Sequence, residues 1–117
     1  MPFKFEKLEV WKLAIEMGND VHFLTRNFPK EELFSLTSQM KRAADSNSLN
    51  IAEGSTGQSD PEQRRFLGYA QRSALEVVNC LYLAIKRNYI TEEIFGKFYS
   101  ASETLVAKIT AFKNSLK

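Results

Sequence analysis

Apolar side chains recur along most of this chain at intervals of three and four residues, the spacing that places them on one side of an α-helix. The pattern covers four long segments, at about residues 6–26, 32–53, 60–87 and 91–116, and none of the connections has strand-like alternation. Short connections make successive helices antiparallel neighbours. We therefore predict an all-α protein with one domain over residues 1–117, folded as an up-down-up-down antiparallel four-helix bundle.

The first and last helices each carry two apolar seams. The main seam of the first helix contains Val10, Ala14, Met17, Val21, Leu24 and Phe28, and its second seam contains Leu8, Trp11, Ile15, Gly18, His22 and Thr25. The last helix has a main seam of Ile94, Phe98, Ala101, Leu105, Ile109, Phe112 and Leu116, and a shorter one of Phe95, Tyr99, Ser102 and Val106. A monomeric bundle needs one seam per helix. The extra seams predict a homo-oligomer with Trp11, Phe95, Tyr99 and Val106 at its interface.

The two middle helices each have one core stripe. The stripe of the second helix is Leu36, Met40, Ala43, Ala44, Asn47 and Ile51. The stripe of the third helix is Phe66, Tyr69, Ala70, Ser73, Val77, Cys80, Leu81 and Ala84.

Residue types at the helix ends support these boundaries. Gly54 is expected to end the second helix in a left-handed conformation. Ser59 or Asp60 is expected to cap the third helix, with Pro61 at its first position. Thr91 is expected to cap the fourth helix.

The second helix places four polar residues on or beside its core stripe: Gln39, Asn47, Asn50 and Glu53. Buried polar groups are costly unless they are hydrogen-bonded, so these residues indicate either a site or a packing network. We interpret them as a structural network that fixes helix register.

A set of basic residues lies on the second and third helices: Lys41, Arg42, Arg64, Arg65, Arg72, Lys86 and Arg87. With Tyr82 interleaved, they could follow a phosphate backbone and give salt-dependent binding with little sequence preference. The alternative is a solvated face with local ion pairs, such as Arg72 with Glu76 one turn later.

Composition changes this picture little. The 117 residues carry 16 basic and 14 acidic side chains, a net charge of +2, which permits a basic patch but is less than a dedicated DNA-binding domain usually has. The single cysteine, Cys80, excludes a disulfide scaffold. The chain has neither a signal-peptide pattern nor an apolar run of membrane-spanning length, so we expect a cytoplasmic protein with no membrane partner.

The sequence has no arrangement of residues typical of an enzyme. His22 is the only histidine, whereas metal sites and catalytic triads need several matched groups. The loop after Gly54 lacks the lysine and the preceding strand of a phosphate-binding loop. We expect no catalytic activity, metal, cofactor or small-molecule substrate.

Six segments carry a family resemblance: Phe5–Ala14, Phe28–Pro29, Leu36–Ala44, Asn50–Gly54, Phe66–Leu67 and Ser73–Glu76. Taken together, they resemble the 23S rRNA intervening-sequence family of four-helix bundle proteins over nearly the whole chain. Members are similar in fold to the accessory protein of diversity-generating retroelements. The resemblance implies a ring-like homopentamer and, in the accessory proteins, a basic surface that meets nucleic acid and a reverse transcriptase. Many members are encoded inside intervening sequences of bacterial 23S ribosomal RNA genes.

The chain departs from the family pattern at two places. The segment Ser46–Ile51 lacks the family's usual proline and adds a polar residue to the core side, and Arg72 replaces a small residue. Our hypothesis is a non-enzymatic oligomeric scaffold that binds structured RNA or a ribonucleoprotein through basic faces of helices two and three. The alternative is a protein–protein adaptor that acts through the seams of helices one and four without binding nucleic acid.

Overall fold

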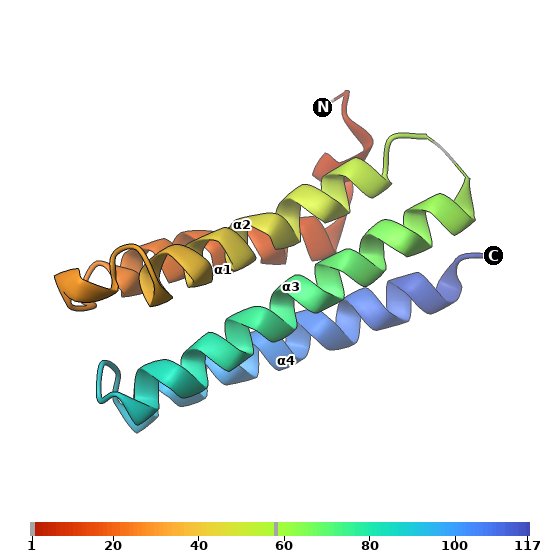
Figure 1. Cartoon of the computed structure of the whole chain (residues 1–117). Helices are drawn as coiled ribbons and strands as arrows, with labels where there is room; N and C mark the ends of the chain where they lie inside the picture. The colour runs from red at the N-terminus through yellow and green to blue at the C-terminus, as the bar shows by residue number, and fades with distance from the viewer. Residues whose placement is uncertain (1, 58) are drawn as a thin grey trace.

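Four long helices make up most of the computed structural model, which describes residues 2–57 and 59–117 (Figure 1). The helices are α1 (Glu9–Thr25), α2 (Leu36–Gly54), α3 (Asp60–Lys86) and α4 (Glu92–Ser115). Two short 3₁₀ helices, η1 (Lys4–Lys7) and η2 (Lys30–Glu32), precede α1 and α2. The described residues contain no strand, which confirms the predicted all-α class and the four helices.

Each helix folds back beside the one before it (Figure 1). Both chain termini and the α2–α3 connection lie at one end of the molecule, and the α1–α2 and α3–α4 connections lie at the other. The molecule measures 43 × 22 × 22 Å. Packing is extensive between α1 and α2, α2 and α3, and α3 and α4, whereas the contact between α1 and α4 is much smaller than these three.

The predicted core stripes are largely buried. Every member of the α2 stripe is buried, including Asn47. The prediction for α3 is wrong at Tyr69, which is 36% exposed, whereas Leu67 and Ala74 are buried instead. The Tyr69 ring lies at the rim of the bundle, edge-on to Phe66 with ring centroids 5.7 Å apart. In α4, Ala101 is exposed because it lies beside the loosely packed α1.

Two helices begin later than predicted. Residues 4–7 form η1, and the extended backbone at Leu8 separates it from α1. The second helix begins only at Leu36, and the side chain of Glu32, which lies in η2, forms hydrogen bonds with the start of the helix. The Glu32 carboxylate accepts hydrogen bonds from the Ser35 hydroxyl at 2.6 Å and the Leu36 N–H at 3.3 Å, so it caps α2 from outside the helix.

The other helix ends agree with the sequence. Ser59 Oγ accepts the Glu62 N–H, and Thr91 Oγ1 accepts the Ile94 N–H, as N-caps do. The chain leaves α3 through Asn88, whose φ of 62° is left-handed. The Tyr89 N–H donates to Ala84 O at 2.9 Å and the Asn88 N–H donates to Ile85 O at 3.0 Å, the two hydrogen bonds of a Schellman motif.

The prediction for Gly54 is wrong. Gly54 is the last residue of α2 and has no positive φ; the left-handed glycine of this connection is Gly57, with φ 90°. A Cβ built on Gly54 would lie 2.7 Å from the Cβ of Phe66 on α3. Glycine is therefore needed here for the close approach of two helices.

Candidate nucleic-acid interface

A polar network joins α2 to α3. Asn47 is 1% exposed, and its Nδ2 donates to Ala70 O on α3 at 2.6 Å. Asn50 Nδ2 donates to Ser46 Oγ at 3.0 Å, and the Ser73 hydroxyl of α3 donates to the same oxygen at 3.1 Å. The structure thus brings two of the four proposed network residues, Asn47 and Asn50, onto the α2–α3 contact.

The other two proposed network residues, Gln39 and Glu53, are exposed. Gln39 instead lines a surface groove between α2 and α3.

Basic side chains line two adjoining grooves, one on each flank of α3. The groove between α2 and α3 has a volume of about 560 Å³ and is lined by Gln39, Arg42, Arg72, Leu75, Glu76, Asn79 and Cys80. The groove between α3 and α4 has a volume of about 610 Å³ and is lined by Pro61, Arg64, Arg65, Gly68, Tyr69, Gln71, Arg72, Leu75, Val106 and Lys113. Arg72 and Leu75 line both grooves. We name the cationic side chains of this surface the basic ridge: Arg42, Arg64, Arg65, Arg72 and Lys113.

The cations of the basic ridge differ in how tightly they are held. Arg64 Nη1 donates to Leu116 O at 3.1 Å, so this guanidinium also ties down the end of α4. Arg65 forms an ion pair with Glu62, and its guanidinium lies 5.5 Å from the centroid of the Phe66 ring. Lys113 Nζ donates to Gln71 Oε1 at 3.3 Å across the α3–α4 contact.

Arg72, like Arg42, is held less tightly than the other cations of the ridge. Its guanidinium lies 6.0 Å from the centroid of the Tyr69 ring, and it makes no ion pair with any described residue. The ion pair with Glu76, which the alternative of a solvated face predicts, is therefore not formed. Its charge is available to an anion from outside the chain.

Three of the seven basic residues picked from the sequence lie elsewhere. Arg87 Nη1 is 3.1 Å from Glu32 Oε2, at the far end of α3. Lys86 is also at that end, about 21 Å along the helix from Arg72 at 1.5 Å per residue. Lys41 is half-buried and does not belong to the lining of either basic groove.

Sequence reasoning missed Lys113. The end of α4 lies beside the start of α3, as the 2.7 Å hydrogen bond from Gln71 Nε2 to Thr110 Oγ1 records. The sequence could have predicted that Lys113 lies near Gln71. Two antiparallel helices rise equally per residue, so positions at equal distances from the short α3–α4 turn lie side by side.

Glu32 fastens the two turns at the end of the bundle opposite the chain termini. Its carboxylate accepts the Tyr89 hydroxyl at 2.7 Å and faces Arg87, in addition to the bonds from Ser35 and Leu36. Hydrogen bonds from Ser35 and then Tyr89 lower the pKa of Glu32 to about 2, although burial opposes them. The bond to Glu32 also raises the pKa of Tyr89.

Cys80 and His22, the only cysteine and the only histidine, both have surroundings that indicate a structural role. Burial raises the pKa of the Cys80 thiol, which keeps it protonated and weakly nucleophilic. His22 Nε2 lies 2.9 Å from Asp45 Oδ2 and links α1 to α2. Within residues 2–57 and 59–117, no three His, Cys, Asp or Glu side chains are grouped to hold a metal ion. No helix in this part of the chain is long and apolar enough to cross a membrane.

The four residues proposed for the oligomer interface lie on two helices, Trp11 on α1 and Phe95, Tyr99 and Val106 on α4. Trp11 packs edge-on against Phe5, with ring centroids 4.8 Å apart, near the end that holds the N-terminus. Phe95 and Tyr99 stack with centroids 5.7 Å apart near the start of α4, at the opposite end. Val106 lines the α3–α4 groove beside the basic ridge.

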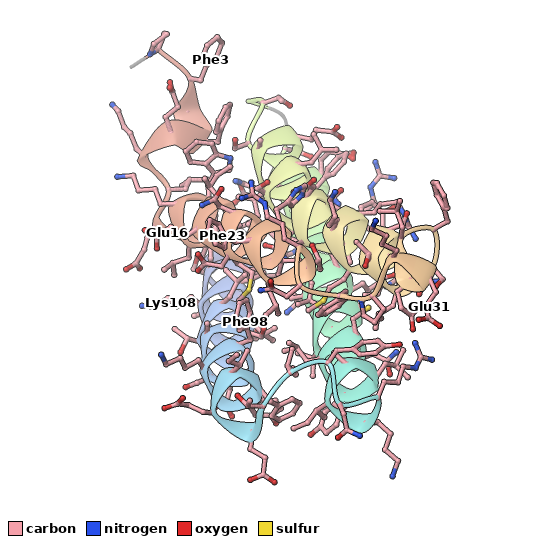
Figure 2. The ribbon with its side chains drawn as sticks, turned by 90° about the vertical axis from the view of Figure 1, so that its left-hand side faces the viewer. Phe3, Glu16, Phe23, Glu31, Phe98 and Lys108 are labelled. Carbon is pink, nitrogen blue, oxygen red and sulfur yellow. The ribbon has the colours of Figure 1, made fainter. Side chains whose placement is uncertain are left out.

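The groove between α1 and α4 is larger than either basic groove and is lined in part by the main apolar seams of these two helices. Its volume is about 820 Å³. In Figure 2, which views the molecule from the end that holds the α1–α2 and α3–α4 connections, Glu16 and Phe23 on α1 and Phe98 on α4 lie on the left-hand side. The sequence does contain a signal for this apolar groove, because Leu13 and Phe23 are apolar residues that belong to neither seam of the first helix.

Comparison with known proteins finds a match over most of the chain. Residues 6–111 match a protein family described as 23S rRNA-intervening sequence protein. One similar solved structure is a protein of unknown function from the S23 ribosomal protein family of Bacteroides thetaiotaomicron. It superposes with a TM-score of 0.83 at 24% sequence identity, over 90% of this chain and 95% of that one, which shows a shared fold. No curated protein matches the sequence.

Proposed function

The chain belongs to the 23S rRNA-intervening sequence protein family, and we propose that it is a non-enzymatic scaffold that binds structured RNA or a ribonucleoprotein. Binding occurs at the basic ridge. The scaffold is an up-down-up-down bundle assembled into a ring-like homo-oligomer, a pentamer as the family resemblance implies, and it acts in the cytoplasm. The family name, which refers to an intervening sequence of ribosomal RNA, supports this proposal.

The observation that carries the proposal is the convergence of positively charged side chains around Arg72. Cations from three helices line two grooves that meet at this residue. The planar guanidinium group binds phosphate oxygens through two parallel hydrogen bonds. Tyr69 is exposed beside Arg72 and offers a ring on which an unpaired base can stack.

The strength of binding follows from the local charge. Two carboxylates, Glu62 and Glu76, lie among the five cations, so the ridge neutralises only a few phosphates. Each phosphate neutralised on single-stranded nucleic acid contributes about −0.7 to the slope of log K against log salt. For three to four contacts we expect a total slope of about −2 to −3 and weak binding at physiological salt.

A pair of charge reversals tests the proposal. Arg42→Glu with Arg72→Glu removes two exposed cations that make no ion pair with a described residue, so the fold is retained. A matched control, Lys4→Glu with Lys12→Glu, makes the same change in net charge at exposed positions outside both basic grooves. The ridge variant should lose RNA binding at low salt while the control retains most of it. Equal losses in both variants, at unchanged helicity, would refute the assignment of the ridge.

The second candidate function is a protein–protein adaptor that binds no nucleic acid. The α1–α4 groove favours it, because large apolar grooves on monomers mark interaction sites. The same RNA assay separates the two functions. A folded wild-type protein that binds no RNA even at low salt favours the adaptor.

A further inference from the structure

The α1–α4 groove exposes a large apolar surface. Phe23 is 64% exposed on its α1 side, and Phe98 and Ile94 line its α4 side. The rim is charged, with Glu16 and Asp20 on α1 and Lys97 on α4. None of these three groups forms an ion pair within the described chain. The groove thus offers apolar walls, two unpaired carboxylates and one unpaired ammonium group.

A complementary projection lies in the α1–α2 connection. Phe34 is 92% exposed and Leu33 is 49% exposed, directly after η2. Lys30 and Glu31 precede them, both are exposed, and neither forms an ion pair within the described residues. We name residues 30–34 the apolar tip. Like the groove, it combines apolar side chains with unpaired charges, here one of each sign.

The apolar tip is held in place. Glu32, in the middle of it, is hydrogen-bonded to Ser35 and Leu36 at the start of α2, and to Tyr89 and Arg87 beyond α3. Phe34 is therefore presented to solvent from an ordered turn that is fastened at both sides. An anchor that is ordered before binding loses little conformational entropy when it docks.

The tip of one chain does not fill the groove of the same chain, because Phe34 is 92% exposed. Figure 2 places Glu31 of the tip on the opposite side of the bundle from Glu16, Phe23 and Phe98 of the groove. The occupant must therefore come from another molecule, and a second copy of this chain supplies both the apolar side chains and the complementary charges.

We propose that the apolar tip of one copy seats in the α1–α4 groove of the next, with Phe34 buried between Phe23 and Phe98. Lys30 then faces Asp20, and Glu31 faces Lys97. This inference rests on the homo-oligomer of the proposed function and places its interface at residues other than Trp11, Phe95, Tyr99 and Val106. The contact is head-to-tail, so it repeats from copy to copy and closes into a ring if the rotation permits.

The first test measures mass in solution over a range of concentrations. Phe34→Ala removes the central anchor, and we expect association to weaken by about 30-fold or more, as for other interface hot spots. Leu49→Ala is the matched control, because Leu49 is 57% exposed on α2 and lines neither the groove nor the tip. An oligomer unchanged by Phe34→Ala would overturn the inference, and a partner protein other than a second copy would then have to fill the groove.

The second test reports the direction of the contact. In a Cys80→Ser background, one chain carries Lys30→Cys and a larger tagged chain carries Asp20→Cys, which lines the groove, so Phe34 stays in place. Oxidation of the mixture should give the mixed disulfide in preference to either homodimer. A preference for the homodimer of the Lys30→Cys chain would overturn the head-to-tail contact.

The two tests also separate this inference from the proposed function. RNA binding by Phe34→Ala is measured on the same samples. Retained RNA binding with an unaffected oligomer overturns the interface alone. A monomeric wild-type protein overturns both the interface and the oligomer, whereas the basic ridge is judged separately by its own RNA affinity.

Discussion

The contact between Gly54 and Phe66 makes a sharp prediction about stability. In Gly54→Ala, the new Cβ would lie 2.7 Å from the Cβ of Phe66. Carbon atoms in contact prefer a separation of about 3.5–4.0 Å, so α2 and α3 must separate by roughly 1 Å at this point. Neither Cβ can rotate away because both are fixed to backbone. Such overpacking costs about 1–3 kcal/mol, partly offset by about 0.5–1 kcal/mol from the higher helix propensity of alanine.

Gly96→Ala provides the matched comparison. Gly96 is exposed within α4, and nothing lies within 4 Å of the position of its added Cβ. Here only the propensity gain remains, so this variant should be more stable than wild type by about 0.5–1 kcal/mol. The same substitution in two helices of one protein is thus expected to change stability in opposite directions.

Thermal and urea unfolding measure both effects. At roughly 4 °C per kcal/mol for a chain of this size, Gly54→Ala should lower Tm by about 4–8 °C and Gly96→Ala should raise it by about 2–4 °C. All variants are compared at one protomer concentration, because oligomers couple stability to concentration. Equal stability of the two variants would refute the close helix approach at Gly54.

Two further predictions concern the turns at the opposite end of the bundle. The pKa of Glu32 is lowered from 4.5 to about 2, so its contribution to stability is complete above about pH 4.5 and is lost as the pH falls toward 2. The urea unfolding midpoint of Glu32→Gln should therefore vary less with pH over this range than that of wild type. Parallel pH profiles for the two proteins would contradict the role of Glu32. Asn88 holds φ at 62°, so Asn88→Gly should raise stability by about 0.5 kcal/mol and Asn88→Ala should lower it by about 1 kcal/mol in chemical denaturation; the reverse order would contradict the left-handed helix end.

Periodicity and capping chemistry were sufficient to predict the four helices. The 3–4 spacing of apolar residues is a local property, and Ser59 and Thr91 act on amides three residues away. Features that depend on distant partners were missed. Glu32, which bonds to the start of α2, also accepts a hydrogen bond from Tyr89, 57 residues along the chain. The need for glycine at position 54 follows only from the position of Phe66 on another helix.

The candidate site was only partly predictable for the same reason. Sequence placed Arg42, Arg64, Arg65 and Arg72 on adjoining helices, but helical spacing cannot say which of them already have partners. Arg87 is used by Glu32, whereas Arg72 has no carboxylate partner within the described residues. Lys113 joins the ridge through the pairing of α3 with α4, which depends on the register of the whole bundle.

The most direct test of the account is the affinity of the purified protein for structured RNA across a salt titration, with the mass of the protein measured on the same samples. The account predicts an oligomer whose affinity falls linearly in log salt with a slope of about −2 to −3, reduced by about 1–2 in Arg42→Glu with Arg72→Glu. A folded protein that shows no RNA binding at low salt would contradict it.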